Sequence, residues 1–175
     1  MNISDKGVKL ICSFEGFSAK PYPDPGTHAE PYTIGYGTTV YPDGKKVTMA
    51  DPSVTTDQAL GFVQDYVTKN ITGWLNTNLP TLTQTQFDSL CSFIYNVGLG
   101  NFESSTLLKD IKKGASNDVI TTDFNMWDKS GGKVMNGLVK RRGEEADLYC
   151  NGNYPRVFSN TSITAQLPGS YYPIR

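Results

Sequence analysis

The helical pattern of this chain breaks at Gly16 and returns only at Thr55, so two kinds of structure must alternate along it. Before the break, apolar side chains recur at helical spacing over residues 4–15, which predicts a short helix. Residues 16–51 contain five prolines and five glycines, residues that interrupt helices. We therefore expect strands and turns in this segment, and helices on either side of it.

Two short strands are expected inside the proline-rich segment. Residues 32–36 and 45–49 contain β-branched and aromatic side chains, and Pro42-Asp43-Gly44 is typical of a turn between strands. A sheet of this size is not stable alone. We therefore expect the first helix to pack against the later helices and not against this sheet.

Helical signals return at Thr55 and continue to Gly152. Thr55 with Gln58, and Thr83 with Gln86, each match a capping box, and the first of them begins a helix of about 20 residues. Further helices are predicted over residues 105–113, 116–127 and 136–150. The last residues, 154–175, carry three prolines and no periodicity, which predicts a C-terminal tail.

Together these patterns predict an α+β, mainly helical fold with two lobes in a single domain over residues 1–175. The β-rich lobe covers about residues 16–54, and the helical lobe covers residues 1–15 and 55–153. A cleft between two lobes is a common place for a ligand site.

Composition excludes several classes of function. Lys and Arg number 16 and Asp and Glu 17, which leaves a net charge of −1 and no overall basic field for nucleic acid. No apolar run reaches the roughly 18 residues of a membrane span, and the first residues lack the pattern of a signal peptide. Three widely spaced cysteines and one histidine favour neither a disulfide framework nor a metal site. We expect no metal and no cofactor.

Three polar residues at nine-residue intervals are candidates for chemistry. Glu15 ends the apolar first helix, a place where burial and the helix C-terminus both favour the protonated carboxyl that a general acid requires. Asp24 lies between prolines, and Thr33 begins a strand. Singly, they have ordinary explanations as a solvated acid, a turn former and a strand former. As a set, two carboxyls and a hydroxyl at a cleft suit glycoside hydrolysis.

Three separated segments carry recognisable motifs. They are EGFSAKPYPD (15–24) with YTIGYG (32–37), QFDSLCSFIYNVG (86–98), and FNMW (124–127) with GLVKRRGEEA (137–146). In this order they resemble the phage-type lysozymes, or endolysins, of glycoside hydrolase family 24. The resemblance covers about residues 5–152, and three separated matches are more specific than one. It implies a lysozyme-like fold with the active-site cleft between a small β-hairpin lobe and a helical lobe.

The resemblance also implies a function. Such an enzyme is a muramidase that hydrolyses the β-1,4 bond between N-acetylmuramic acid and N-acetylglucosamine in bacterial peptidoglycan, and so lyses the host cell for phage release. By position, Glu15 matches the catalytic acid, Asp24 matches the acid that positions or activates the attacking water, and Thr33 matches the active-site threonine. The implied outcome is inversion, which requires room for a water between the two carboxyls.

One departure from the family pattern lies between Asp24 and Thr33, where eight residues stand in place of the usual five. We expect a longer loop around residues 27–31, in which Glu30 is a rival to Asp24. Further substrate contacts are expected from Tyr22, His28, Tyr36 and Asn96. His28 is alternatively an ordinary exposed loop residue, and Asn96 alternatively caps its helix.

A locally basic stretch precedes and enters the last predicted helix. It contains Lys129, Lys133, Lys140, Arg141 and Arg142. This stretch either meets the acidic peptides of a cell wall or simply solvates the helix. Arg142 lies at helical spacing from Leu138 and Ala146, so its alternative is a pair with a carboxylate inside the helical lobe.

Two other functions stay open at this stage. One is a lytic transglycosylase that uses Glu15 alone, and the other is a non-catalytic wall-binding module. Asp24 argues against the first and Glu15 against the second. The expected partners are peptidoglycan and a holin or other membrane-permeabilising protein, which gives a monomeric enzyme access from the host cytoplasm to the wall. We expect no nucleic-acid partner.

Overall fold

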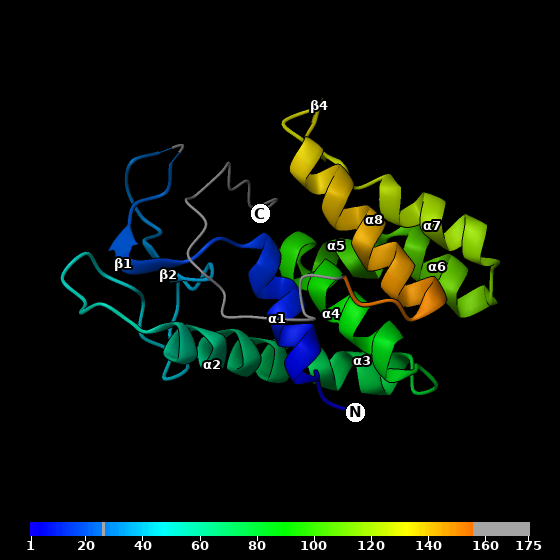
Figure 1. Ribbon diagram of the computed structural model, residues 1–175, viewed down its shortest axis with the longest axis horizontal. Coiled ribbons are helices and arrows are strands. Elements are labelled where there is room, and N and C mark those ends of the chain that lie inside the picture. The colour runs from blue at the N-terminus through cyan, green and yellow to red at the C-terminus, as the bar shows by residue number, and fades with distance from the viewer. Residues whose placement is uncertain (26, 156–175) are drawn as a thin grey trace.

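A computed structural model of the chain describes residues 1–25 and 27–155 (Figure 1). Its helices and strands are α1 (Asp5–Phe14), β1 (Ser18–Tyr22), β2 (Thr33–Gly35), α2 (Thr56–Val67), the π-helical turn η1 (Thr68–Thr72), α3 (Gly73–Asn78), α4 (Gln84–Val97), α5 (Leu99–Ser104), α6 (Thr106–Lys113), α7 (Asn117–Asn125), β3 (Lys129–Ser130), β4 (Lys133–Val134) and α8 (Asn136–Asn151). The mainly helical α+β architecture is confirmed. Of the predicted tail, all but residues 154–155 lie outside the described residues.

The β-rich lobe differs from the prediction in how its strands pair. β2 pairs antiparallel with β1, and Tyr22 lies opposite Thr33. Residues 45–47 return instead along residues 39–41, where Val47 N donates to Thr39 O at 2.9 Å and Val40 bridges to Lys46. The predicted turn at residues 42–44 is thus correct, but it joins a different, narrower ribbon.

Two glycines explain this difference. Gly35 has a φ of 64° and Gly37 a φ of 93°, a left-handed conformation that other residues rarely adopt. They reverse the chain at once, so that Ile34 bridges back to Thr38. The strand that begins at Thr33 therefore ends before it can pair with residues 45–49.

The helical lobe follows the predicted signals closely. Both capping boxes are present, at Thr55–Gln58 and Thr83–Gln86. The helix begun by Thr55 continues through η1 and α3 to Asn78, slightly beyond the predicted length. Gly114 and Gly152, both left-handed, end α6 and α8.

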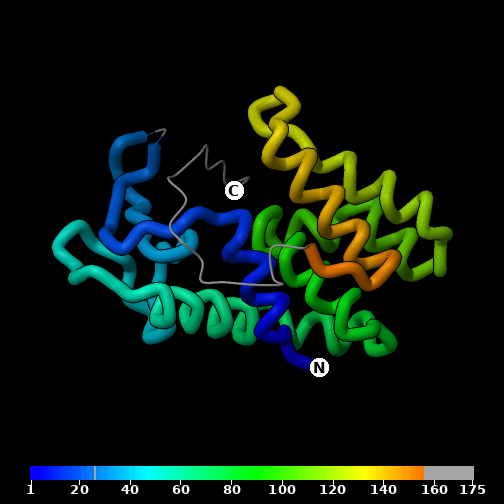
Figure 2. The backbone as a smooth tube through the Cα atoms, in the orientation of Figure 1, coloured from blue at the N-terminus to red at the C-terminus, as the bar shows by residue number. Residues whose placement is uncertain are grey.

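Helix α4 forms the centre of this lobe. Every residue of α4 from Phe87 to Val97 is buried, and the helix packs against both α1 and α8. The N-terminal helix therefore joins the later helices, as predicted, although the small β-rich lobe lies between them in sequence (Figure 2). In Figure 1, α2 extends from beneath the β-rich lobe towards the helical lobe.

Helix α5 and strands β1, β3 and β4 were not predicted from the sequence. Gly98 ends α4, and Gly100 lies inside the short helix α5 that follows. Strands β3 and β4 form a hairpin ahead of α8, with Gly131 and Gly132 at positive φ between them. Among residues 1–25 and 27–155, no helix combines the length and the apolar character needed to cross a membrane.

Candidate active site

Glu15 occupies the junction between the two lobes. It is the C-cap of α1, where its backbone N–H donates to Cys12 O at 3.3 Å, and the residue is only 5% exposed. A carboxylate at this end of a helix faces the negative end of the helix dipole. Because the position is also buried, a carboxylate here requires a compensating partner.

That partner is Arg141, from α8. Its Nη1 donates to Glu15 Oε1 at 2.6 Å, and its guanidinium lies 4.9 Å from the ring centroid of Phe14. Arg141 is itself 3% exposed. The guanidinium is planar and presents several donors, so it fixes the carboxyl in direction as well as in position.

The other nitrogen atoms of Arg141 also donate hydrogen bonds. Nε donates to Glu145 Oε1 at 2.9 Å, and Nη2 donates to the carbonyl oxygen of Ser92 at 2.9 Å. Burial alone would lower the pKa of Arg141, but the carboxylates of Glu15 and Glu145 raise it above its ordinary value. Arg141 is thus a fixed cation at the base of the site.

A second arginine completes this buried network. Arg142 Nη1 donates to Glu145 Oε2 at 2.7 Å, and Nη2 donates to Asn96 Oδ1. Its guanidinium lies over Phe93, 4.8 Å from the ring centroid. Burial, together with the neighbouring Arg141 cation, lowers the pKa of Arg142 to about 10, although Glu145 opposes this effect.

Both readings of the basic stretch as an exposed surface are wrong for these two arginines. Arg142 does pair with an interior carboxylate, as its helical spacing indicated, and the carboxylate is Glu145. The role of Arg141 was missed. The signal in the sequence was Glu145. It lies four residues after Arg141 and three after Arg142, so it shares a helix face with both.

Tyr22 and Thr33 belong to the two strands of the β-rich lobe. They lie opposite each other in the β1–β2 register, and their side chains are hydrogen-bonded. The pKa of Tyr22 is raised by burial and then by the charges of Glu15 and Asp24, while the hydrogen bond with Thr33 opposes the shift. The charges of Glu15 and Asp24 thus both act on the hydroxyl of Tyr22, and Thr33 lies opposite Tyr22 across the two strands.

Asp24 is held by the longer loop. Its Oδ1 accepts from Thr27 N at 2.9 Å and from Thr27 Oγ1 at 3.3 Å, while its backbone N–H donates to Ala29 O at 3.1 Å. Additional residues between Asp24 and Thr33 therefore close back on the carboxylate and position it. His28 is exposed, with a φ of 55°, and donates its backbone N–H to Asp24 O at 2.8 Å.

Two of the expected substrate contacts lie in the interior. Tyr36 is 1% exposed and packs on Phe17, with 5.3 Å between ring centroids, and Tyr95 donates its hydroxyl to Tyr36 O at 3.0 Å. Asn96 is buried and accepts from Arg142. Both side chains are enclosed by protein, so we assign them to packing and to the arginine network, and not to substrate contact.

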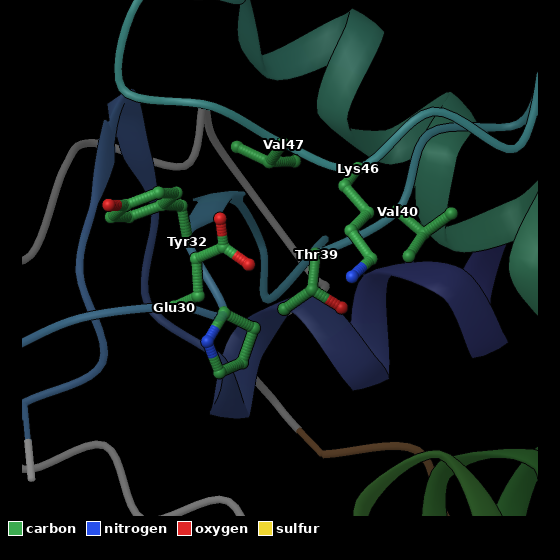
Figure 3. A pocket seen from close by; sticks show the side chains of 7 residues that line it. Glu30, Tyr32, Thr39, Val40, Lys46 and Val47 are labelled. Carbon is green, nitrogen blue, oxygen red and sulfur yellow. The ribbon is translucent and has the colours of Figure 1, made fainter. Parts of the chain in front are cut away.

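Glu30 lies apart from these groups. It is exposed and lines a separate hollow with Tyr32 and Lys46 (Figure 3). After Glu15, the second carboxylate whose charge raises the pKa of Tyr22 is Asp24. Within residues 1–25 and 27–155, no three His, Cys, Asp or Glu side chains gather as they would around a metal ion.

The chain is similar to known phage proteins. The Phage lysozyme family model matches residues 12–145. The endolysin of Bacillus phage PZA is 40% identical over 168 residues, covering 96% of this chain and 62% of the relative, and that of Bacillus phage B103 is 41% identical over 165 residues, covering 93% and 59%. This chain thus spans about three fifths of the length of these two relatives.

A solved structure is similar over nearly its whole length. The endolysin from Escherichia coli O157:H7 phage FAHEc1 superposes with a TM-score of 0.77 at 33% identity, covering 89% of this chain and 98% of that one. The endolysin of Acyrthosiphon pisum secondary endosymbiont phage 1 is 35% identical over 154 residues, covering 85% of this chain and 98% of the relative.

Proposed function

Because this chain belongs to the phage lysozyme family, we propose that it is an endolysin that hydrolyses the β-1,4 bond between N-acetylmuramic acid and N-acetylglucosamine in peptidoglycan. One observation carries this proposal. The buried carboxyl of Glu15, fixed by Arg141, shares its surroundings with Tyr22, Thr33 and a second carboxyl on Asp24. A pair of carboxyls is the usual equipment of glycosidases.

The chemistry divides between the two carboxyls. Glu15 donates a proton to the glycosidic oxygen as the bond to the anomeric carbon breaks. Asp24, with Thr33, holds a water on the opposite face of the sugar and accepts a proton as the water oxygen bonds to that carbon. Water enters from the face opposite the leaving group, so the anomeric configuration inverts.

Arg141 acts on Glu15 and not on the sugar. Its three contacts with Glu15, Glu145 and Ser92 fix the direction of the guanidinium. The carboxyl of Glu15 is therefore held in one place, and efficient proton transfer depends on such positioning. Arg141 is thus a positioning residue.

Product analysis by mass spectrometry on purified peptidoglycan tests the proposed reaction. Hydrolysis yields reducing N-acetylmuramic acid ends. Anhydro-muramic acid ends would instead identify a lytic transglycosylase, in which Glu15 acts as acid and then as base. Tight wall binding without any cleavage would identify a wall-binding module.

The proposal includes how the enzyme meets its substrate. It is a monomer whose single catalytic domain spans residues 1–175, made in the host cytoplasm, and it reaches the wall after a holin or other protein permeabilises the membrane. Two relatives carry the name endolysin, which supports action on the cell wall. Expression in bacteria without a holin, followed by fractionation, tests it. Intact enzyme in the periplasm without membrane damage would contradict it.

A further inference from the structure

A hollow of about 290 Å³ lies on the β-rich lobe, outside the contacts described for Glu15 and Asp24 (Figure 3). One wall is the approach to β2, formed by Glu30, Pro31 and Tyr32. The other is the narrow ribbon in which residues 39–40 pair with residues 46–47. This volume is near the lower end of small-ligand sites, about 300 Å³, so the hollow suits one residue-sized group.

The hollow presents charges of both signs. Figure 3 shows the carboxylate of Glu30 and the ammonium of Lys46 directed into it from opposite walls, with the ring of Tyr32 and the hydroxyl of Thr39 beside them. Among the ion pairs of the described residues, none joins Glu30 to Lys46. Two opposite charges that face one space without pairing match a ligand that carries both charges itself.

The residues of one wall of the hollow are close in sequence to the proposed catalytic residues. Tyr32 directly precedes Thr33. At the other end of the same wall, Ala29 accepts the backbone hydrogen bond of Asp24 at 3.1 Å, immediately before Glu30. The wall of the hollow is therefore continuous in the chain with Asp24 at one end and Thr33 at the other.

We propose that this hollow binds the zwitterionic end of a diamino-dicarboxylic acid residue in the peptide stem of peptidoglycan. The ammonium of that end contacts Glu30, the carboxylate contacts Lys46, and the aliphatic part of the side chain lies against Tyr32. This inference rests on the proposed function, because the stem must hang from a muramic acid held in the cleft. A stem residue three positions from the sugar reaches about 10 Å.

The glycan itself is a poorer match for the hollow. N-acetylglucosamine has no charge, and the carboxyl of N-acetylmuramic acid is consumed by the amide bond to the stem. A stem with a lysine in place of the diamino-dicarboxylic acid offers an ammonium without the carboxylate. Both charges of the hollow are used only when the stem residue keeps its own ammonium and carboxylate.

The test compares Glu30→Gln and Lys46→Gln with wild type on three substrates. These are peptidoglycan whose diamino-dicarboxylic acid ends are free, the same material with that carboxylate amidated, and glycan strands stripped of their peptides. Lys45→Gln is the matched control, because Lys45 is the exposed neighbour of Lys46 and pairs with Asp43 outside the hollow.

We expect each hollow variant to raise KM about three- to fivefold on the free-ended material, since exposed charge pairs are individually weak. On peptide-free strands, both should match wild type in KM and kcat. Amidation of the carboxylate should remove the effect of Lys46→Gln and preserve that of Glu30→Gln. The control should behave as wild type on all three substrates.

Equal KM values for wild type and variants on free-ended stems would overturn the proposal. So would equal losses on free-ended and peptide-free substrates, because the hollow would then serve the fold or the glycan. Failure of the proposed function is a separate outcome, in which wild type releases no reducing ends from any substrate. NMR titration with the free-ended stem peptide then decides the binding proposal by itself: shifts at Tyr32 and Thr39 that Lys46→Gln weakens support it, and their absence refutes it.

Discussion

Arg141 Nη1 donates to Glu15 Oε1 at 2.6 Å across 126 positions of the chain, so that the last helix holds the end of the first. Both side chains are buried, at 4% and 6% exposure. The same guanidinium also binds Glu145 and Ser92. The proposed acid of the reaction is therefore positioned by the interior of the helical lobe.

Replacing Glu15 with Gln should abolish peptidoglycan cleavage and leave the fold intact. The amide nearly preserves the shape of the side chain and can still accept from Arg141, but it has no acidic proton to give. Loss of general acid catalysis costs at least about 10²–10⁴-fold in rate. Turnover on purified wall fragments, with circular dichroism as the check on folding, measures the effect. A folded Glu15→Gln protein with near-normal turnover would refute the assignment of Glu15.

Replacing Arg141 with Met should destabilise the protein and reduce its activity together. The substitution leaves Glu15 and Glu145 as buried charges without this partner, and breaking a buried pair in this way costs about 3–5 kcal/mol. The neighbouring Lys140 provides the matched control, because its pair with Glu144 spans 3.8 Å at the surface. Lys140→Met should cost less than about 1 kcal/mol. Urea unfolding compares them, and similar losses for both variants would contradict the role of Arg141.

Asp24 and Glu30 make different contacts, so substitutions at the two positions should have different effects on kcat. Asp24→Asn should reduce kcat severely, because an amide does not accept a proton from the attacking water. Glu30 is exposed and lines the separate hollow, so Glu30→Gln should leave kcat near wild type. Both variants are assayed on the same peptidoglycan. An inactive Glu30→Gln with an active Asp24→Asn would reverse the assignment. If both keep full kcat while Glu15→Gln is inactive, a single-acid transglycosylase becomes the better interpretation.

The sequence predicts the helix ends well but not the contact between Glu15 and Arg141. Helix ends follow from residues close in the chain: Thr55 and Gln58 form their capping box wherever the helix packs. The partner of Glu15 could not be found in this way. Arg141 is brought to Glu15 only when α1 and α8 both pack around α4, and no local pattern encodes that meeting.

The β-rich lobe illustrates the same limit at shorter range. Residues 45–49 were predicted to be a strand from their composition, but composition does not select a partner. The reversal at Gly35 and Gly37 selects it, and Gly35 is further constrained by α2, since an added Cβ would lie 2.8 Å from Ala59 Cβ. The Asp24–Thr33 departure was likewise visible as a count of residues, whereas its closure on Asp24 through Thr27 was not.

Stability should change with pH through the pair of Asp123 and Asp110. Burial raises the pKa of Asp123, and the charge and hydrogen bond of Asp110 add to the shift, while Lys113 pairs with Asp110 at 3.3 Å. A raised folded-state pKa means that the native state binds the proton more tightly, so this contribution is present below the unfolded pKa of about 3.9 and is lost as pH rises through the folded value. Asp123→Asn should therefore raise Tm at pH 7 relative to wild type.

The advantage of Asp123→Asn should shrink as the pH falls through the raised folded-state pKa of Asp123, and it should be smallest below about pH 4, where the folded and unfolded forms of wild type both bind the proton. Thermal melts of the two proteins from pH 3 to pH 8 measure this difference. A gap in Tm that stays constant over the whole range would show that the carboxyl pair does not cause it.

The last prediction concerns Gly7, which lies in α1 against the buried carboxylate of Asp88. Asp88 accepts from Ser4 N at 3.0 Å, from Gln84 Nε2 at 2.9 Å and from the hydroxyl of Tyr154 at 2.6 Å, so it joins the start of α1 to α4 and to the residues after α8. An added Cβ at Gly7 would lie 2.6 Å from Asp88 Cγ. Alanine normally stabilises a helix relative to glycine by about 1 kcal/mol, but here it must displace a carboxylate that several donors hold. We expect Gly7→Ala to destabilise the protein by about 1–3 kcal/mol.

Gly61, inside α2, is the control for Gly7, because an added Cβ there meets nothing within 4 Å. Gly61→Ala should stabilise the protein by about 0.5–1 kcal/mol. Urea unfolding of both variants at pH 7 therefore gives opposite signs if close packing against Asp88 decides the effect. Stabilisation by both substitutions would mean that α1 shifts to admit the methyl group without losing the contacts of Asp88. The NMR chemical shifts of Ser4 and Tyr154 would then be unchanged in Gly7→Ala as well.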